Sequence, residues 1–314
     1  MTTSGTTTFN LDLNDLVEEA FERCGLELRT GYDLRTARRS LNLLTVEWAN
    51  RGINLWTVEQ GQITMNTGQA MYALPNNTID LLDQVIRQYN GSSANQVDIN
   101  ISRIAEPTYS TIPNKLTQGR PIQVWINRQS GQSSVTTATI TANITSTSTT
   151  IDVSDVAVLP AAGFIKLDSE LISYNTLTQT STSGTAGTLT NLGRGQQNTI
   201  PASHTSGAII TLSNPPSINV WPAPNAGGGY TFVYWRMRRV QDAGTGVTDQ
   251  DIPFRFIPCM VAGLAYYISL KKPDVSPDRV MMLKQDYEQQ FQLASDEDRD
   301  KAPLRYVPRN MFYA

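Results

Sequence analysis

Apolar residues recur at helical spacing in residues 252–270, which read IPFRFIPCMVAGLAYYISL. The residues at steps of three or four are Ile257, Val261, Leu264, Ala265 and Ile268. This spacing places them on one face of an α-helix, and that face has to be buried against other elements. Pro253 or Pro258 sets the start and Pro273 stops the helix, so we predict a helix over residues 254–270.

A second helix is predicted directly after this one, over residues 276–297. Ser276 is suited to cap its N-terminus and Pro277 to its first position. Its apolar stripe consists of Val280, Leu283, Tyr287, Phe291 and Ala294.

Two more helices are predicted near the start of the chain, over residues 12–24 and 33–50. The first ends before Gly25, a residue that terminates helices readily, and the second ends before Arg51-Gly52. Their stripes are Leu13, Leu16, Val17, Ala20, Phe21 and Cys24, and Leu34, Ala37, Leu41, Leu44 and Trp48. We expect the helices from both ends of the chain to form one helical bundle.

The segments between the helices read as strands. Leu55–Met65 and Ala70–Leu74 flank a turn sequence and predict a hairpin, and Leu81–Tyr89 and Val97–Ile104 flank another. Pro121–Arg128 alternates apolar and polar residues, as a strand with one buried face does. These segments predict an antiparallel β-sheet or a barrel-like region.

The composition changes abruptly within residues 131–213, where Ser and Thr dominate and charges are few. Short β-prone runs separated by glycines predict a small all-β module there. Strand-like sequence resumes at Ser217–Trp221 and Tyr230–Arg239, so the module is inserted into a hairpin of the first sheet. The predicted fold class is α+β, with a core formed by residues 1–130 plus 214–314, an inserted domain of residues 131–213, and an extended C-terminal segment of residues 301–314.

Charge and composition exclude several functions. The formal net charge is −3 and charged residues make up 17% of the chain, so no basic excess supports sequence-independent nucleic-acid binding. No run approaches the roughly 18–20 apolar residues of a membrane span, and the polar start has no basic region of a secretion signal. We therefore expect a soluble protein made in the cytoplasm. The two cysteines, Cys24 and Cys259, are expected to be reduced and buried.

No arrangement of residues predicts catalysis, a metal or a cofactor. Glu18-Glu19 and Asp296-Glu297-Asp298 are consecutive on helices and are interpreted as solvated charges. Asp249 and Asp251 do not complete a calcium-loop pattern. Ser203-His204 contains the single histidine and has no nucleophile-elbow context, so we interpret it as part of a turn. Gly193-Arg194-Gly195 is likewise interpreted as a turn.

Two surface features leave alternatives open. Arg35, Arg38 and Arg39 fall mostly off the apolar stripe of their helix and form either a solvated face or a subunit interface. Four tryptophans in strand-like sequence either bind sugars as a row or pack in the core and between subunits; they are Trp56, Trp125, Trp221 and Trp235.

Four blocks of sequence resemble the head-to-tail adaptor family of short-tailed phages, also called tail tubular or packaged-DNA-stabilising proteins. They are Leu43–Gly52, Ile252–Pro258, Val261–Pro273 and Asp298–Pro308. The resemblance implies a structural virion protein, part of a ring of usually twelve subunits between the portal and the tail nozzle. DNA would pass through the lumen of this ring without specific binding, and fibres or other tail proteins would be further partners.

The end of the chain has no periodicity but is rich in apolar residues and arginines. Under the resemblance it is expected to become ordered by docking into a portal groove, with a frayed terminus as the alternative. The candidate docking residues are Arg305, Tyr306, Val307, Arg309, Phe312 and Tyr313.

The inserted segment is similar to small β modules of other phage virion proteins. The similarity rests on the order of Glu170–Tyr174, Leu192–Gly195 and Ala202–Ala208, and it gives His204 a place in a module signature. A virion hydrolase acting on polysaccharide or peptidoglycan is the alternative function, because carboxylates are present. A module that binds host glycans is a third.

Overall fold

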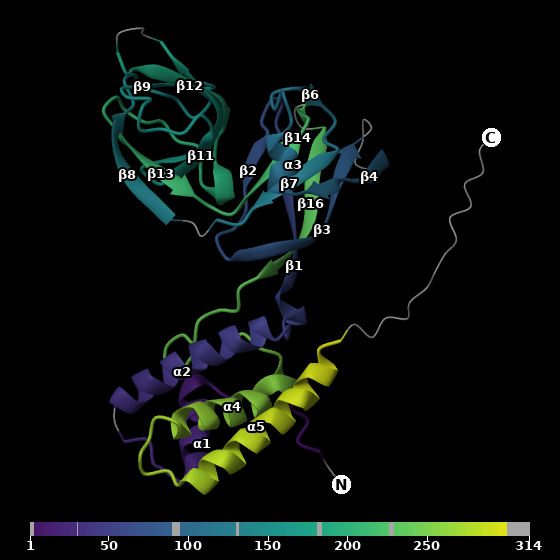
Figure 1. The fold of residues 1–314 in the computed structure, drawn as a ribbon, viewed down its shortest axis with the longest axis vertical. Coiled ribbons are helices and arrows are strands. Elements are labelled where there is room, and N and C mark those ends of the chain that lie inside the picture. The colour runs from purple at the N-terminus through teal and green to yellow at the C-terminus, as the bar shows by residue number, and fades with distance from the viewer. Residues whose placement is uncertain are drawn as a thin grey trace, which may run out of the picture. The chain divides into compact units, whose positions relative to one another are not determined.

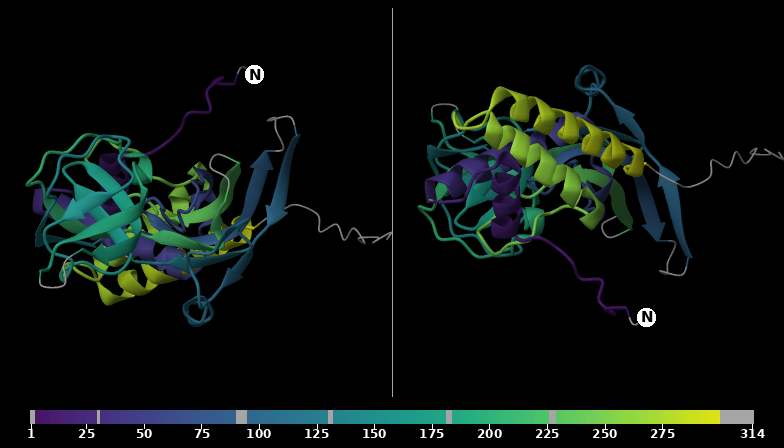
Figure 2. Two further views of the ribbon diagram at one scale, coloured as in Figure 1. Left: turned by 90° about the horizontal axis from the view of Figure 1, so that it is seen from above. Right: turned by 90° about the horizontal axis from the view of Figure 1, so that it is seen from below.

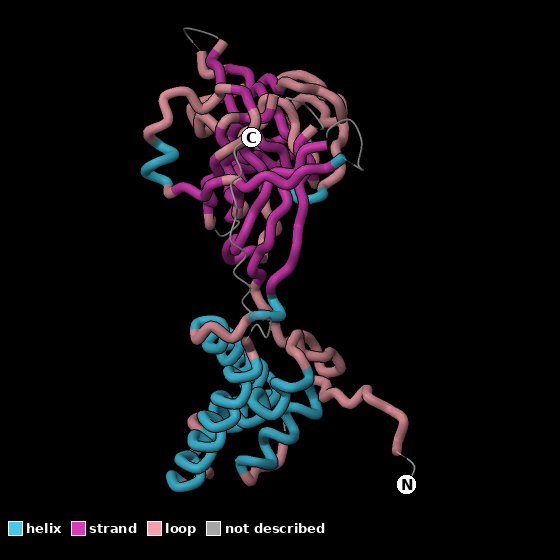
Figure 3. Tube along the Cα trace, turned by 90° about the vertical axis from the view of Figure 1, so that its right-hand side faces the viewer, coloured by secondary structure: helices cyan, strands magenta, loops and turns pink. Residues whose placement is uncertain are grey.

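The computed structural model describes residues 3–29, 31–89, 95–129, 132–180, 184–225 and 229–299. Within them the protein is mixed α and β (Figure 1) and divides into two compact units, Met1–Thr57 with Val240–Ala314, and Val58–Arg239. Figure 3 shows that most helical residues belong to the first unit and the strands to the second. The α-helices of the described residues are α1 (Leu13–Cys24), α2 (Gly31–Asn50), α3 (Glu106–Ser110), α4 (Ile257–Ser269) and α5 (Pro277–Glu297).

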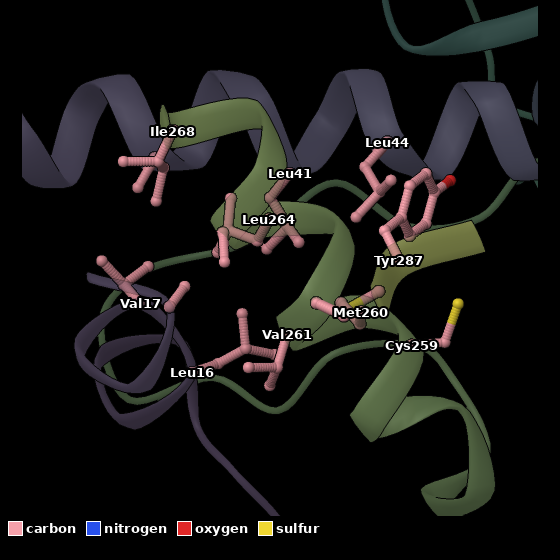
Figure 4. Packing of buried hydrophobic residues seen from close by; sticks show 14 of the residues in the cluster. Leu16, Val17, Leu41, Leu44, Cys259, Met260, Val261, Leu264, Ile268 and Tyr287 are labelled. Atoms are coloured by element: carbon pink, nitrogen blue, oxygen red, sulfur yellow. The ribbon is translucent and has the colours of Figure 1, made fainter. Parts of the chain in front are cut away.

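The first unit is built around α4, which is buried along most of its length and packs against α1, α2 and α5. In Figure 4, Leu16 of α1 and Leu41 of α2 lie against Val261 and Leu264 of α4. The right-hand view of Figure 2 shows α5 beside α4. Burying an aliphatic side chain fully stabilises the fold by about 1.5–3 kcal/mol, so this one cluster dominates the stability of the unit.

Local signals set the helix ends. Asp12 accepts a hydrogen bond from the Asp15 amide at 2.9 Å and therefore stands before α1 as its cap, while Gly25 takes the left-handed conformation that ends it. α4 begins at Ile257 because residues 254–256 form a separate 3₁₀ turn after Pro253. α2 begins at Gly31, two residues before the predicted start.

Both cysteines are buried and free, as expected. Burial raises the pKa of Cys24 to about 11 and that of Cys259 to about 12, so both thiols stay protonated at neutral pH. None of the helices in the described residues is both long and apolar enough to cross a membrane.

Two four-stranded sheets of the second unit share one hydrophobic cluster, to which both contribute buried residues such as Phe232 and Val124. In spatial order the first sheet is β1 (Val58–Thr64), β16 (Tyr230–Arg238), β3 (Thr78–Tyr89) and β4 (Gln96–Asn100). The second is β2 (Met71–Ala73), β14 (Ser217–Trp221), β7 (Gln123–Asn127) and β5 (Ser102–Ile104). Two short strands, β6 (Gln118–Gly119) and β15 (Ala223–Pro224), pair beside them.

The sheets correct three predictions. The hairpin predicted from Leu55–Met65 and Ala70–Leu74 is wrong, because β1 pairs with β16 and β2 pairs with β14 in the other sheet. The pairing of β5 with β7 is parallel, since residues 105–122 supply the long crossover that parallel strands need. Within the described residues no sheet closes into a barrel, so the barrel-like region is also wrong. The predicted antiparallel pairing of β3 with β4 is confirmed.

A six-stranded antiparallel sheet lies between β7 and β14 in the sequence and has a hydrophobic cluster of its own. The strands that flank it, β7 and β14, pair with each other, with Ser217 opposite Asn127. In spatial order it consists of β8 (Gln132–Thr139), β13 (Ile209–Asn214), β10 (Gly163–Leu167), β11 (Glu170–Gln179), β12 (Gly187–Gly193) and β9 (Ile151–Val153).

Buried amide side chains attach the six-stranded sheet to β2. Gln69 donates to the Ser173 hydroxyl at 3.2 Å, and the Ala73 amide donates to Gln196 at 3.0 Å. Gln69 and Gln196 are both buried, so these bonds are protected from competing water. Leaving a buried donor or acceptor without a partner costs about 1–3 kcal/mol. These two hydrogen bonds therefore favour one alignment of β2 against the six-stranded sheet.

Gly263 tests how tightly α4 is packed. A Cβ at this position would lie 2.8 Å from Leu44 Cδ1 and 2.9 Å from Tyr287 Cε2. We expect Gly263→Ala to destabilise the helical unit by about 1–3 kcal/mol, because overpacking outweighs the better helix propensity of alanine. Gly31→Ala in α2 is the matched control, since a Cβ there meets nothing within 4 Å. Calorimetric unfolding of the full chain measures both, and equal transition temperatures would contradict the prediction.

Candidate functional site

The most concentrated group of charged side chains is buried in the six-stranded sheet. Glu170 opens β11, Arg194 directly follows β12, and His204 lies in the loop before β13. Glu170 is 0% exposed and His204 is 4% exposed, whereas the nearby Asp168 side chain is 72% exposed. Three segments distant in sequence thus place their charges at one interior point.

Glu170 accepts hydrogen bonds at both carboxylate oxygens. Arg194 binds it in a bidentate manner, with Nε and Nη2 each 2.7 Å from an oxygen. The amides of Gly195 and Ala202 donate at 3.2 and 3.0 Å, and His204 Nε2 lies 3.0 Å from Oε2. Arg194 also donates to the Thr145 and Ala202 carbonyls, so its charge is spread over main-chain acceptors as well.

The protonation state of Glu170 follows from these contacts. Burial by itself would raise the pKa of this carboxyl, because it removes water from the charged form. Hydrogen bonds from Arg194, the Ala202 amide and His204 outweigh burial and lower the pKa to about 2. Glu170 is therefore a carboxylate at any physiological pH.

The geometry of this cluster does not support hydrolysis. His204 Nδ1 lies 2.8 Å from Asp168 and its Nε2 faces Glu170, so both ring nitrogens already have carboxylate partners. A general base needs one nitrogen free for the hydroxyl that it activates. Glu170 is enclosed and cannot flank a bound sugar as one of a pair of carboxylates. The cluster acts as an internal clamp, and the interpretation of residues 193–195 and 203–204 as simple turns missed it.

Two of the other predicted acidic residues, Asp298 and Asp251, have local partners. The Asp298 carboxylate accepts from the Asn54 and Leu55 amides at 2.8 and 3.2 Å, so it is a capping group and not a solvated charge. Asp251 accepts from the Gln241 amide at 3.0 Å. Among the described residues, no group of three or more His, Cys, Asp or Glu side chains is arranged so that it could hold a metal ion.

The tryptophans do not form one row. Trp56 packs on Phe256 in the helical unit, whereas the other three belong to strands of the second unit. Trp125 stacks on Tyr109 with ring centroids 5.2 Å apart, and Trp221 donates to the Asn114 carbonyl at 3.0 Å. These contacts favour packing over a sugar-binding surface.

One helix of the first unit carries a basic and apolar outer face. Along α2, Tyr32 is 63% exposed and Leu43 is 56% exposed, and Arg35 and Arg39 lie at helical spacing between them. Arg38 lines the same shallow hollow as Tyr32 and the other two arginines. Within the described part of the chain, none of the three guanidinium groups has a hydrogen bond or ion pair with a carboxylate.

An acidic hollow lies along another helix of this unit. Asp15, Glu18 and Glu22 of α1 line it at helical spacing, and Phe9 and Pro258 contribute apolar surface. None of these three carboxylates has an ion-pair partner among the described residues. The predicted docking residues Arg305, Tyr306, Val307, Arg309, Phe312 and Tyr313 lie outside the described residues.

The described residues thus combine a buried internal ion pair with charged and apolar outer faces on the helices. The family model of the SU10 adaptor protein matches residues 116–309, and the chain therefore belongs to this family of phage structural adaptors. The match includes the six-stranded sheet, α4 and α5, and it leaves out the Leu43–Gly52 block. No curated protein matches the chain.

The buried ion pair makes a strong prediction for Arg194→Ala. Removing the guanidinium leaves Glu170 charged and enclosed, so we expect the strand unit to lose about 3–5 kcal/mol of stability. Arg87→Ala is the matched control, because the Asp98 carboxylate that Arg87 binds at 2.8 Å has a 41% exposed side chain. An exposed pair contributes at most about 1 kcal/mol. Calorimetry compares the two variants, and equal losses would contradict the clamp.

A second prediction concerns pH. The pKa of Glu170 is about 2 in the folded protein, against its ordinary value of 4.5, which we take for the unfolded chain. The contribution of Glu170 to the free energy of unfolding is therefore complete above about pH 4.5 and is lost as the pH falls toward 2. The shift corresponds to on the order of 3 kcal/mol. We expect Glu170→Gln to be less stable than the wild type by about this amount at neutral pH, with the gap closing in acid.

Urea unfolding of both proteins across this pH range measures the gap. Asp168→Asn removes the exposed carboxylate of the same cluster and is the matched control. A gap of the same size and pH course in both variants would show that Glu170 has no special role.

Proposed function

We propose that this chain is a subunit of the head-to-tail adaptor ring of a short-tailed, podovirus-like phage, placed in the virion between the portal and the tail nozzle. The observation that carries the proposal is the match to the SU10 adaptor protein over residues 116–309. DNA would pass through the lumen during ejection without specific binding. The net charge of −3 supports this, since it gives no excess of cations to hold phosphates.

The ring is proposed to contain twelve copies. A closed ring requires head-to-tail contacts, so each subunit needs two unlike surfaces that fit each other. The basic face of α2 and the acidic hollow of α1 supply two such surfaces.

Residues 131–213 are proposed to form an inserted module that faces outward and contacts a fibre or another tail protein. Two observations support this proposal. β7 and β14, which precede and follow the six-stranded sheet in the sequence, pair with each other, and that sheet has a hydrophobic cluster of its own. Residues 1–130 plus 214–314 would then be the adaptor core.

The segment 301–314 is proposed to dock into a groove of the portal protein. Its composition supports this, because Tyr306, Phe312 and Tyr313 suit apolar pockets and Arg305 and Arg309 suit polar clamps.

Deleting residues 305–314 tests the docking. We expect the truncated chain to bind isolated portal rings at least about tenfold more weakly, since a few buried aromatic and arginine residues carry most of a binding energy. Lys301→Ala is the control for a nonspecific loss of positive charge, and calorimetry shows whether the fold is retained. Surface-bound portal rings give the affinity directly, and unchanged binding would overturn the docking role.

The ring itself is tested by electron microscopy of virions that carry this protein with a bound antibody fragment. Density at the head–tail junction is expected. Density only on fibres or inside the head would overturn the adaptor function.

A further inference from the structure

The outer face of α2 combines positive charge with exposed apolar side chains. Tyr32, Arg35, Arg39, Leu43 and Val46 follow each other at steps of three or four, so they form one stripe along the helix. Val46 is 47% exposed, and Tyr32 and Leu43 are exposed by more than half. Tyrosine and arginine are enriched at protein interfaces, and a contiguous exposed apolar patch marks an interaction site.

The charge on this stripe is not neutralised within the described chain. Burial of Lys271, and after it the nearby charge of Arg39, lowers the pKa of this lysine, so a further cationic group lies close to the stripe. Lys272, by contrast, is paired with Asp33 at 2.6 Å. The three arginines therefore present a net positive face that is open to a partner with carboxylates.

The hollow of α1 has the complementary character. Glu18 and Glu22 are exposed one turn apart, and Asp15 extends the same face. Glu19 and Arg23 neutralise each other at 2.9 Å, so they leave the charge of the other three carboxylates in place. Phe9, 75% exposed, offers an apolar contact at the edge of the hollow.

The two faces cannot pair within one copy. α1 and α2 each bury their apolar side against α4, as Leu16, Val17, Leu41 and Leu44 show in Figure 4. The carboxylates of α1 line a hollow to which Pro258 of α4 also contributes, whereas the arginines of α2 line a separate hollow, and no ion pair joins the two among the described residues. Complementary faces of this kind can meet only between copies.

We propose that the α2 face of one copy binds the α1 hollow of the next copy, with guanidinium–carboxylate pairs around a contact of Tyr32, Leu43 and Phe9. This inference rests on the proposed ring, since unlike faces of one chain make the head-to-tail contact that a ring requires. The basic segment 301–314, with Lys301, Arg305 and Arg309, carries the wrong charge to occupy the α2 face. DNA has the right charge but offers little to the exposed Leu43 and Val46.

Charge exchange between the two faces provides the test. One variant carries Arg35→Glu and Arg39→Glu, a second carries Glu18→Lys and Glu22→Lys, and a third carries all four changes. Self-association of the full chain is measured by sedimentation at low ionic strength, where exposed charges are least screened. Calorimetry confirms that each variant is folded.

Each two-residue variant is expected to self-associate at least about tenfold more weakly than the wild type, because its two faces carry like charge. An equimolar mixture of these two variants, and the four-residue variant alone, are expected to recover association, because opposite charges face each other again. High salt should weaken association in every sample that shows it.

Three outcomes overturn the pairing: no association of the wild type at low salt, equal association of all variants, or a mixture that fails to recover. Loss of duplex DNA binding by Arg35→Glu/Arg39→Glu with unchanged self-association would assign the face to DNA instead. The adaptor function is judged separately by the position in virions. If the protein is found at the head–tail junction but all variants associate equally, only the pairing of the two faces is wrong and the adaptor function stands.

Discussion

The burial of α4 on nearly every side is the constraint on which the helical unit depends. A helix with apolar residues all round has to be covered by other elements, and here both ends of the chain supply them. α1 and α2 come from the start of the chain, α5 from its end. The remainder has to leave this unit and return to it, and it does so in neighbouring antiparallel strands, with Val58 of β1 opposite Met237 of β16.

A segment that leaves and returns through paired strands is found a second time, within the strand unit itself. β7 and β14 are paired neighbours, and the chain between them forms the six-stranded sheet before it returns. Because paired strands hold the two ends of such a segment close together, an insertion there leaves the parent sheet intact. The segment then needs its own source of stability. Its hydrophobic cluster supplies most of it, and the Glu170–Arg194 pair fixes three loops that apolar packing alone would leave less defined.

The sequence was sufficient for elements whose signals are local. The apolar stripes, together with Gly25 and Ser276, predicted the helices, because caps and periodicity act within a few residues. Strand partners were harder: alternation identifies a strand but not its neighbour, so β1 was assigned to β2 when its partner lies more than 160 residues away. The clamp was missed for the same reason, since Glu170, Arg194 and His204 meet only in the folded sheet. The order of Glu170, Gly193-Arg194-Gly195 and His204 was the signal that could have indicated it.

The division of charge between interior and surface explains how such a protein can be stable and still assemble. In the six-stranded sheet, Glu170 accepts five hydrogen bonds from groups of the same chain. Its charge is therefore neutralised inside the fold and is not available to bind a partner. Asp15, Glu18 and Glu22 of α1 and Arg35, Arg38 and Arg39 of α2 have no ion-pair partner among the described residues and remain available. Charges of the second kind add little to the stability of the lone chain. Substitutions that reverse these surface charges should therefore leave the chain folded. Surface charge can thus direct assembly while the buried clusters maintain the fold.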